Sequence, residues 1–259
     1  MRVDFKWCGV YNKNMITLSK RMEAIASMIT PGGVLADVGT DHGYIPIYQV
    51  QLHRNPYAVA MDLRKGPLER AAEHIRQSGL TGQIKTRLSD GVAALEPGEA
   101  DSIVVAGMGG ELILHILSEG EAVCRQAKEL ILQPQSEIAA VRRYLREHGY
   151  YVDAENMVFE DGKYYPMMRA RNGLNEAQLQ AGEPDDTAGQ ELADLYGALL
   201  LKNAHPVLMQ YLSYQHGQLC TILEELEKQP GSEKIADRIC QIRQQIAWNE
   251  MAQQRMRKS

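Results

Sequence analysis

The sequence predicts an α/β fold in which a mostly parallel sheet of seven strands is followed by a helical C-terminal region. Between residues 18 and 170, short apolar runs alternate with helix-compatible stretches, as in successive βαβ units. Two extended runs separated by Asp161-Gly162 then break this alternation, and Asp-Gly between such runs indicates a β-hairpin. Beyond residue 186 the pattern is helical.

Each strand is expected where an apolar run ends in turn residues. The five parallel strands are predicted at 34–38, 58–61, 84–88, 102–106 and 130–132. The hairpin runs, 150–160 and 163–170, supply the antiparallel pair. A helix is predicted before the first strand, because five apolar residues share one helical face: Leu18, Met22, Ile25, Ala26 and Ile29.

Composition divides the chain into four parts. Residues 1–14 are polar and basic, and we interpret them as a tag remnant or extension. Residues 15–170 are the expected α/β domain, and the polar segment 171–186 is a predicted linker. Residues 187–259 carry two apolar stripes on either side of Pro230-Gly231-Ser232, which predict a projecting coiled-coil hairpin. The stripes are Leu208, Leu212, Leu219, Ile222 and Leu226, and Ile235, Ile239, Ile242 and Ile246.

The overall composition is that of an ordinary globular protein. With 259 residues, 44% hydrophobic and 24% charged, it excludes a disordered chain and a disulfide scaffold. The net charge of −5 disfavours nucleic acid as a partner, because phosphates are neutralised by Lys and Arg. No apolar run reaches the ~18 residues of a membrane span, and residues 1–14 do not resemble a secretory signal. The four cysteines (Cys8, Cys124, Cys220 and Cys240) form no metal-ligand pattern, and we expect buried free thiols in a cytoplasmic protein.

The most informative segment is 34–46, VLADVGTDHGYIP. A strand ends at Asp37, and Gly39 and Gly43 lie in the turn that precedes the next helix, where glycine allows a ligand to approach the backbone. The dinucleotide pattern G-x-G-x-x-G is absent, and Asp41 would repel a pyrophosphate. S-adenosylmethionine (SAM), which carries a sulfonium and an amine, suits these carboxylates.

Three further loops follow predicted strands. Asp62 can hold both hydroxyls of a ribose, and Asp90, in Ser89-Asp90-Gly91, can accept a hydrogen bond from an adenine amino group. Gly107-Met108-Gly109-Gly110 forms a floor that a flat substrate can approach closely. Loops at the carboxyl ends of neighbouring parallel strands meet at one edge of the sheet, so we expect a single site.

Ordered motifs between residues 18 and 170 resemble the bacterial TrmK family of SAM-dependent tRNA (adenine-N1)-methyltransferases, which act on the adenine at position 22. The motifs are LSKR (18–21), DVGTDHGYIP (37–46), DLRKGPL (62–68), SDG (89–91), GMGG (107–110), LILQP (130–134) and EDGKYY (160–165). The resemblance implies a Rossmann-like class I methyltransferase fold, SAM as cofactor, no metal, and tRNA as partner. Where the family has QPN, this chain has Gln133-Pro134-Gln135.

The resemblance also implies the site residues. The candidate cofactor contacts are Asp37, Gly39, Asp41, His42, Gly43, Asp62, Leu63, Asp90, Gly91 and Gly107, with Ser19 and Arg21 as candidates to hold the SAM carboxylate. Adenine N1 attacks with its own lone pair, so no essential general base is expected. Asp41 and the carbonyls of Gly107 and Met108 are the catalytic candidates, because they can stabilise the cation that forms on the base.

Adenine N1 lies on the Watson–Crick edge, so the base must be extruded before methyl transfer. Tyr44, Tyr164 and Tyr165 are candidates to stack on it. Basic clusters that could contact tRNA are Lys20-Arg21, Arg64-Lys65, Arg70, Arg142-Arg143-Arg146, and Arg255, Arg257 and Lys258. A monomer or a weak homodimer is expected.

The residues leave three alternatives open. A SAM methyltransferase could act on a protein or a small molecule. A non-catalytic coiled-coil protein could bind SAM or RNA on a degenerate domain, although the intact Asp37, Gly39, Gly43 and Asp62 oppose this. A nicotinamide oxidoreductase is disfavoured by the glycine pattern and by the hairpin.

Overall fold

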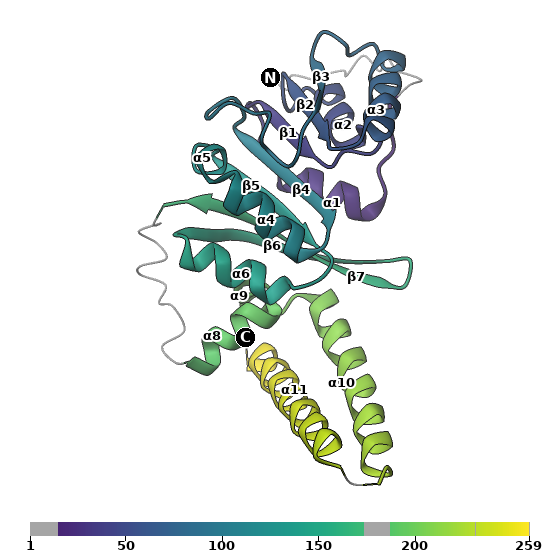
Figure 1. The fold of residues 1–259 in the computed structure, drawn as a ribbon, viewed down its shortest axis with the longest axis vertical. Helices are drawn as coiled ribbons and strands as arrows, with labels where there is room; N and C mark the ends of the chain where they lie inside the picture. Colours follow the sequence, from purple (N-terminus) through teal and green to yellow (C-terminus); the bar gives the residue numbers. More distant parts are fainter. Residues whose placement is uncertain (1–14, 174–186, 231, 259) are drawn as a thin grey trace, which may run out of the picture.

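The computed structural model describes residues 15–173, 187–230 and 232–258. Its centre is a seven-stranded sheet in the order β3-β2-β1-β4-β5-β7-β6 (Figure 1). The first five strands are parallel, and β7 is antiparallel to both of its neighbours. The strands are β1 (Leu35–Val38), β2 (Ala58–Asp62), β3 (Ile84–Leu88), β4 (Ser102–Met108), β5 (Glu129–Pro134), β6 (Tyr150–Glu160) and β7 (Lys163–Asn172). The predicted fold class is confirmed.

Helices cover both faces of the sheet (Figure 1). On one face lie α1 (Lys20–Met28), α2 (Tyr44–Gln51) and α3 (Lys65–Gln77); on the other lie α4 (Gly110–Glu119), α5 (Glu121–Cys124) and α6 (Ile138–Glu147). The alternation of strand side chains divides the core in two. In β4, Ile103 and Val105 pack against the α4–α6 layer, and Val104 packs against the α1–α3 layer. Every residue of β1, β2 and β5 is buried, as expected for central parallel strands.

The hairpin predicted from Asp161-Gly162 is present. Glu160 pairs with Lys163 across a two-residue turn, in which Asp161 (φ 49°) and Gly162 (φ 76°) both lie in the left-handed region. This is the backbone that Asp-Gly turns adopt between twisted antiparallel strands. The turn projects at the right of Figure 1, on the side where β4 ends.

The C-terminal region is helical and projects from the sheet, as predicted. It comprises α8 (Thr187–Tyr196), α9 (Ala198–Lys202), α10 (Pro206–Glu227) and α11 (Glu233–Lys258). We call the antiparallel pair of α10 and α11 the arm (Figure 1). Leu208, Leu212 and Ile242 of the predicted stripes are buried, whereas Ile222 is 37% exposed, because the outer part of the arm is only two helices thick. The predicted parts 1–14 and most of 171–186 lie outside the described residues.

A buried ion pair fastens the C-terminal region to the sheet. The Arg142 Nε of α6 donates to Glu155 of β6 at 2.9 Å, and both side chains are at most 6% exposed. Arg142 also donates to the Asp194 carbonyl, and Arg146 contacts the Asp194 carboxylate at 2.6 Å. The basic cluster at 142–146 is therefore paired with carboxylates of the chain itself, and because the Arg143 side chain is still 45% exposed, its contact with RNA stays a prediction. A sequence pattern does not reveal acceptors that lie about 50 residues further along the chain.

Substituting Gly197 by alanine is expected to lower the free energy of unfolding by about 3 kcal/mol. Gly197 has φ 93°, and a Cβ there would lie 2.5 Å from Glu155 Oε1 and 2.8 Å from Arg142 Nη2, so the buried pair would have to move. Gly79→Ala is the matched control, because Gly79 has φ 71° but open space around it. Urea unfolding of both variants measures the difference, and equal losses would show that the clash costs nothing.

Candidate functional site

The loops that follow β1 to β5 meet at the carboxyl edge of the sheet. β1 and β4 are neighbours there although the chain visits β2 and β3 between them, so the connections diverge to opposite sides. In open α/β sheets this switch point is where ligands bind. The structure brings together here the predicted residues at the ends of β1 to β4 and just after them, which are Asp37 to Gly43, Asp62-Leu63, Asp90-Gly91 and Gly107-Met108.

The turn after β1 is held by backbone hydrogen bonds. The N–H groups of Gly39 and Thr40 both donate to the Met61 carbonyl at 2.8 Å, and Gly43 N–H donates to Thr40 Oγ1 at 3.2 Å. Gly39 (φ 76°) and Gly43 (φ 69°) are in the left-handed region. A Cβ on Gly39 would collide with the Met108 methyl group, so this turn and the turn after β4 lie in contact.

Two buried carboxylates lie beneath this turn. Asp37 and Asp62 are each 7% exposed. Burial raises the pKa of Asp37 to about 7; the hydrogen bond from Thr40 lowers it, and the nearby charge of Asp62 raises it further. Asp62 Oδ1 accepts from the Arg64 N–H at 2.7 Å, which orients its carboxylate at the end of β2. Such a pair favours a ligand that brings positive charge or hydroxyl donors.

Asp41 faces outward from the same turn. Its carboxylate is paired with Arg70 of α3 and lies 3.2 Å from His42 Nε2, and the hydrogen bond from Arg70 holds the pKa of Asp41 below its usual value. The rings of His42, Tyr44 and His74 stack on one another with centroids 5.0 to 5.4 Å apart. Tyr44 is therefore part of a stack beside the turn.

The outer rim of the site is exposed. Leu63, after β2, is 62% exposed, which is unusual for a leucine, and Asp90 after β3 is exposed as well. Gly91 (φ 52°) lies against Ile116 of α4, and a Cβ there would be 2.9 Å from that side chain. These two loops form an apolar and acidic rim that follows β2 and β3, beside Asp62.

The opposite rim is organised by Gln133, which the sequence did not single out as a site residue. Gln133 is fully buried, and its Oε1 accepts from Gly107 N–H at 3.2 Å and from Arg21 Nη1 at 3.1 Å. The Arg21 guanidinium also lies 5.1 Å from the centroid of the Tyr165 ring. The Met108 carbonyl accepts from Gln135 N–H at 2.8 Å, so one of the two candidate carbonyls already has a donor.

Glu160 is a second residue that was missed. One carboxylate oxygen accepts from Ser19 Oγ at 3.1 Å and the other from Arg21 N–H at 3.2 Å, so the hairpin holds the N-terminus of α1 beside the site. Ser19 is also the N-cap of α1. Glu160 lies about 140 residues after its partners, and only its position before Asp161-Gly162 could have drawn attention to it.

Tyr164 points away from Arg21. Neighbouring residues of a strand face opposite sides, and Tyr164 packs against Tyr211 and Tyr214 of α10, with centroids 5.2 and 6.0 Å away. The structure therefore separates the three tyrosine candidates. Tyr165 lies beside Arg21, Tyr44 lies beside His42, and Tyr164 belongs to the junction with the arm.

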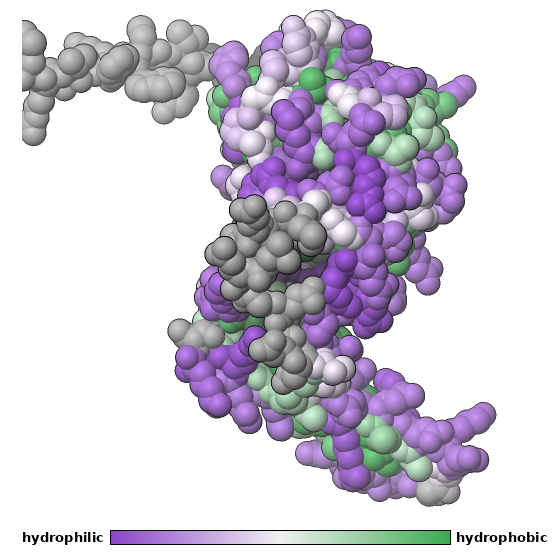
Figure 2. Space-filling view, turned by 90° about the vertical axis from the view of Figure 1, so that its left-hand side faces the viewer, coloured by the Kyte–Doolittle hydropathy of each residue, from purple (hydrophilic) through white to green (hydrophobic). Residues whose placement is uncertain are grey.

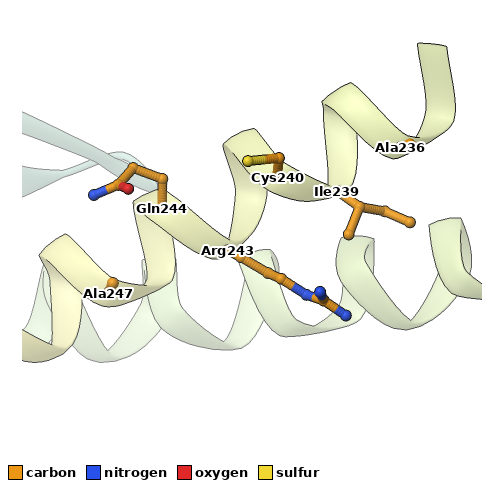
Figure 3. A pocket seen from close by; sticks show the side chains of 6 residues that line it. All are labelled: Ala236, Ile239, Cys240, Arg243, Gln244 and Ala247. Carbon is orange, nitrogen blue, oxygen red and sulfur yellow. The ribbon is translucent and has the colours of Figure 1, made fainter. Parts of the chain in front are cut away.

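The surface of the arm offers no comparable gathering of the predicted site residues. A shallow hollow on α11 is lined by Ala236, Ile239, Cys240, Arg243, Gln244 and Ala247 (Figure 3), far along the arm from the loops of the sheet. Figure 2 shows the arm as a mixture of hydrophilic and hydrophobic side chains.

Cys124 is buried as expected, but Cys240 is exposed, because it faces outward from the thin arm. Within the described ranges, no cluster of His, Cys, Asp and Glu could hold a metal ion, and no helix is long and apolar enough to cross a membrane.

Comparison with known proteins places this geometry in a family. Residues 18–168 match the family described as "Methyltransferase domain". The tRNA (adenine(22)-N(1))-methyltransferase of Bacillus subtilis is 32% identical over 88% of this chain and 94% of its own. The crystal structure of the B. subtilis M1A22 tRNA methyltransferase TrmK has a TM-score of 0.80 at 30% identity, covering 92% of this chain and 99% of that one. Sp1610 of Streptococcus pneumoniae, in complex with S-adenosyl-L-methionine, has a TM-score of 0.77 at 29% identity, covering 92% and 100%.

Proposed function

The chain belongs to the methyltransferase family that includes the B. subtilis tRNA (adenine(22)-N(1))-methyltransferase, and we propose that it transfers the methyl group of SAM to N1 of the adenine at position 22 of tRNA. The observation that carries the proposal is the gathering of Asp37, Asp62 and the Gly39–Gly43 turn at one sheet edge, opposite Arg21 and Gly107. One side of this edge therefore carries carboxylates, and the other carries the Arg21 guanidinium.

The residues of this edge fit SAM. Asp37 and Asp62 are buried, and the nearby charge of Asp62 favours the protonated form of Asp37, so a ligand with cationic and hydroxyl groups would relieve their interaction. We propose that Asp62 holds the ribose hydroxyls, that Asp90 accepts from the adenine amino group beside Leu63 and Gly91, and that Gly39 and Gly43 allow close approach of the backbone. SAM supplies an electrophilic methyl group on a sulfonium.

The side of the edge that carries Arg21 would hold the amino-acid end of SAM and the target base. We propose that Arg21, fixed by Gln133 and Tyr165, holds the SAM carboxylate together with Ser19, and that the Gly107 carbonyl and Asp41 stabilise positive charge on the adenine ring. The N1 lone pair is free at neutral pH, so the protein's contribution is orientation and electrostatic stabilisation. His42, whose ring contacts those of Tyr44 and His74, would keep the turn in place.

The proposed partner is tRNA, and the proposed working state is a monomer or weak homodimer in the cytoplasm. Among the basic clusters, Lys20-Arg21 and Arg64 lie beside the site, whereas Arg255, Arg257 and Lys258 lie in the last turn of α11, which packs against α8 at the base of the arm. We propose that both clusters contact a tRNA bound at the carboxyl edge of the sheet, because both lie at or near the α/β domain and not at the outer end of the arm.

Incubation with labelled SAM and unmodified tRNA tests the proposed function. The expected product is 1-methyladenosine, mapped to position 22 by nuclease digestion and mass spectrometry. A tRNA carrying guanosine at that position is the control substrate, and it should remain unlabelled. Methylation of protein or of a small molecule in place of tRNA would refute the proposal.

SAM is expected to bind about tenfold more tightly at pH 8 than at pH 6, in a way that depends on Asp37. The pKa of Asp37 is raised to about 7 in the free protein, so its carboxyl group is mostly protonated at pH 6 and must lose that proton to face a cationic ligand. Calorimetry at both pH values measures the change. Because the SAM amine also titrates, Asp37→Asn is the reference, and an equal pH dependence in this variant would contradict the prediction.

The same shift affects the stability of the free protein. In the unfolded chain the pKa of Asp37 is near its ordinary value of 3.8, whereas burial in the folded protein raises this pKa to about 7. The unfolded state therefore binds fewer protons than the folded state between these values, and the contribution of Asp37 to stability falls as the pH rises through this window. Asp37→Asn should remove this dependence from the unfolding midpoint.

A further inference from the structure

A cysteine, a histidine and a glutamate meet on the arm, outside the candidate site. Cys220 Sγ of α10 lies 3.7 Å from Nδ1 and 4.0 Å from Nε2 of His216, one turn earlier on the same helix. His216 Nε2 lies 3.2 Å from Glu250 Oε1 of α11. The three side chains therefore connect the two helices of the arm (Figure 1), and no step of the proposed methyl transfer uses them.

The order of these groups is that of an activated nucleophile. A carboxylate only accepts hydrogen bonds, so the imidazole N–H that faces Glu250 is on Nε2. Nδ1 then keeps its lone pair and accepts from the Cys220 thiol. When the thiol proton moves to Nδ1, the thiolate faces an imidazolium, which the Glu250 carboxylate stabilises. The thiolate is the form of cysteine that attacks other groups.

Solvent reaches this thiol. Cys220 is half-buried, and the side chains of His216 and Glu250 are 33% and 55% exposed. Cys124 is buried, and burial raises the pKa of its thiol to about 12. Cys240 is exposed beside the hollow on α11, a helix that contains no histidine (Figure 3). Among the described cysteines, Cys220 alone is both open to solvent and hydrogen-bonded to a histidine.

The surroundings of Cys220 exclude acyl transfer. The residue lies inside α10, where each backbone N–H donates to the carbonyl four residues earlier, so the helix offers no free donor for the oxyanion of a tetrahedral intermediate. Attack on a disulfide needs no such donor, because the leaving thiolate takes the charge. Glu224, exposed one turn after Cys220, and Glu250 flank the thiol, so positively charged reagents are favoured there.

We propose that Cys220 is a modification site that forms a mixed disulfide with a small, positively charged disulfide. Its Sγ bonds to one sulfur of the reagent while the S–S bond breaks, and the other half leaves as a thiolate that takes the proton held on His216. The protein thiol is oxidised and the reagent is reduced, so no further oxidant is needed. The proposal does not depend on the proposed function, because it concerns thiol chemistry on the arm.

Cystamine, a disulfide that carries ammonium groups, is the probe. Reaction with the folded full-length chain at pH 7, followed by peptide mass spectrometry, gives the rate for each cysteine. Cys220 is expected to react about tenfold faster than the exposed Cys240, because an unassisted thiol is only a few per cent thiolate at this pH. In the chain unfolded by urea, the two rates should become equal. A Cys240 rate equal to or above that of Cys220 in the folded protein would overturn the proposal.

His216→Ala tests the role of the base, with His115→Ala, on the exposed surface of α4, as the matched control. His216→Ala is expected to lower the Cys220 rate about tenfold and to leave the Cys240 rate unchanged, whereas His115→Ala should change neither. The unfolding midpoint of both variants should stay near the wild type. Wild-type reactivity of Cys220 in His216→Ala would show that exposure alone sets the rate, which would contradict an activated thiol.

Glu224→Gln tests the preference for positive charge. The wild type should react faster with cystamine than with dithiodipropionate, whose carboxylates are repelled by Glu224 and Glu250. Glu224→Gln should lower this ratio about threefold, whereas Glu225→Gln, which is exposed on another side of the helix, should leave it nearly unchanged. Equal rates of Cys220 with the two reagents in the wild type would refute the proposed class of reagent.

Discussion

Replacement of Asp62 by alanine is expected to raise the dissociation constant for SAM at least about 100-fold. The side chain is 7% exposed, and its carboxylate is oriented at the end of β2 by the Arg64 N–H. A carboxylate that accepts from two ribose hydroxyls contributes two charge-assisted hydrogen bonds, each worth about 1.5–3 kcal/mol. Calorimetric titration with SAM measures the loss.

Asp90→Ala is expected to weaken SAM binding less than Asp62→Ala does. Asp90 is exposed and would accept one hydrogen bond from an adenine amino group, so its removal should cost about tenfold. Both variants should unfold near the wild-type midpoint, because neither carboxylate is part of an apolar core cluster. A larger loss in Asp90→Ala than in Asp62→Ala would show that the cofactor lies differently across the sheet edge.

Asp41→Asn is expected to lower the turnover number at least about 100-fold, with little change in SAM affinity. The substitution keeps the shape of the side chain but removes the negative charge proposed to stabilise the methylated adenine. Single-turnover methylation of tRNA with saturating SAM measures the chemical step. Thermal stability should stay near the wild type, because Asp41 lies on the surface of the turn.

The ion pair between Asp41 and Arg70 provides the control. Asp41→Asn weakens this pair, so part of any loss could come from the pair and not from the charge of Asp41 itself. Arg70→Gln removes the same ion pair and leaves the carboxylate in place, and it should retain most of the single-turnover rate. Equal losses in the two variants would assign the effect to the ion pair and remove Asp41 from the catalytic candidates.

Local sequence patterns predict most of the α/β fold. Each strand was predicted to within two residues at each end, because buried parallel strands are continuous apolar runs and each ends in turn residues. The shape of the hairpin followed from Asp161-Gly162 alone. The docking of α8 against α6 and of α9 against β6 was not predicted, because it depends on Arg142, Glu155 and Gly197, which are apart in the sequence and meet only in the folded chain.

The sequence predicts the side of the candidate site that carries Asp37 and Asp62, but not the side that carries Arg21 and Gln133. The side that carries Asp37 and Asp62 is built from strand ends and the loops that directly follow them, so motif and position identify both residues. The side that carries Arg21 depends on hydrogen bonds between residues more than 100 positions apart, such as Arg21 with Gln133. Tyr164 and Tyr165 are equivalent in the sequence and face opposite sides only because β7 is a strand, which decides that one lies beside Arg21 and the other beside α10.

The position of β6 at the margin of the sheet gives the C-terminal helices a protective role. An uncovered outermost strand of 11 residues could pair with the same strand of another molecule and begin aggregation. Here α9 and α10 contact β6, the Leu199 N–H donates to Glu155 at 2.9 Å, and His205 lies 3.1 Å from Asn156. A shortened chain that ended after β7 would expose this margin, including Met157 of β6, and we expect it to aggregate because the shielding helices are missing.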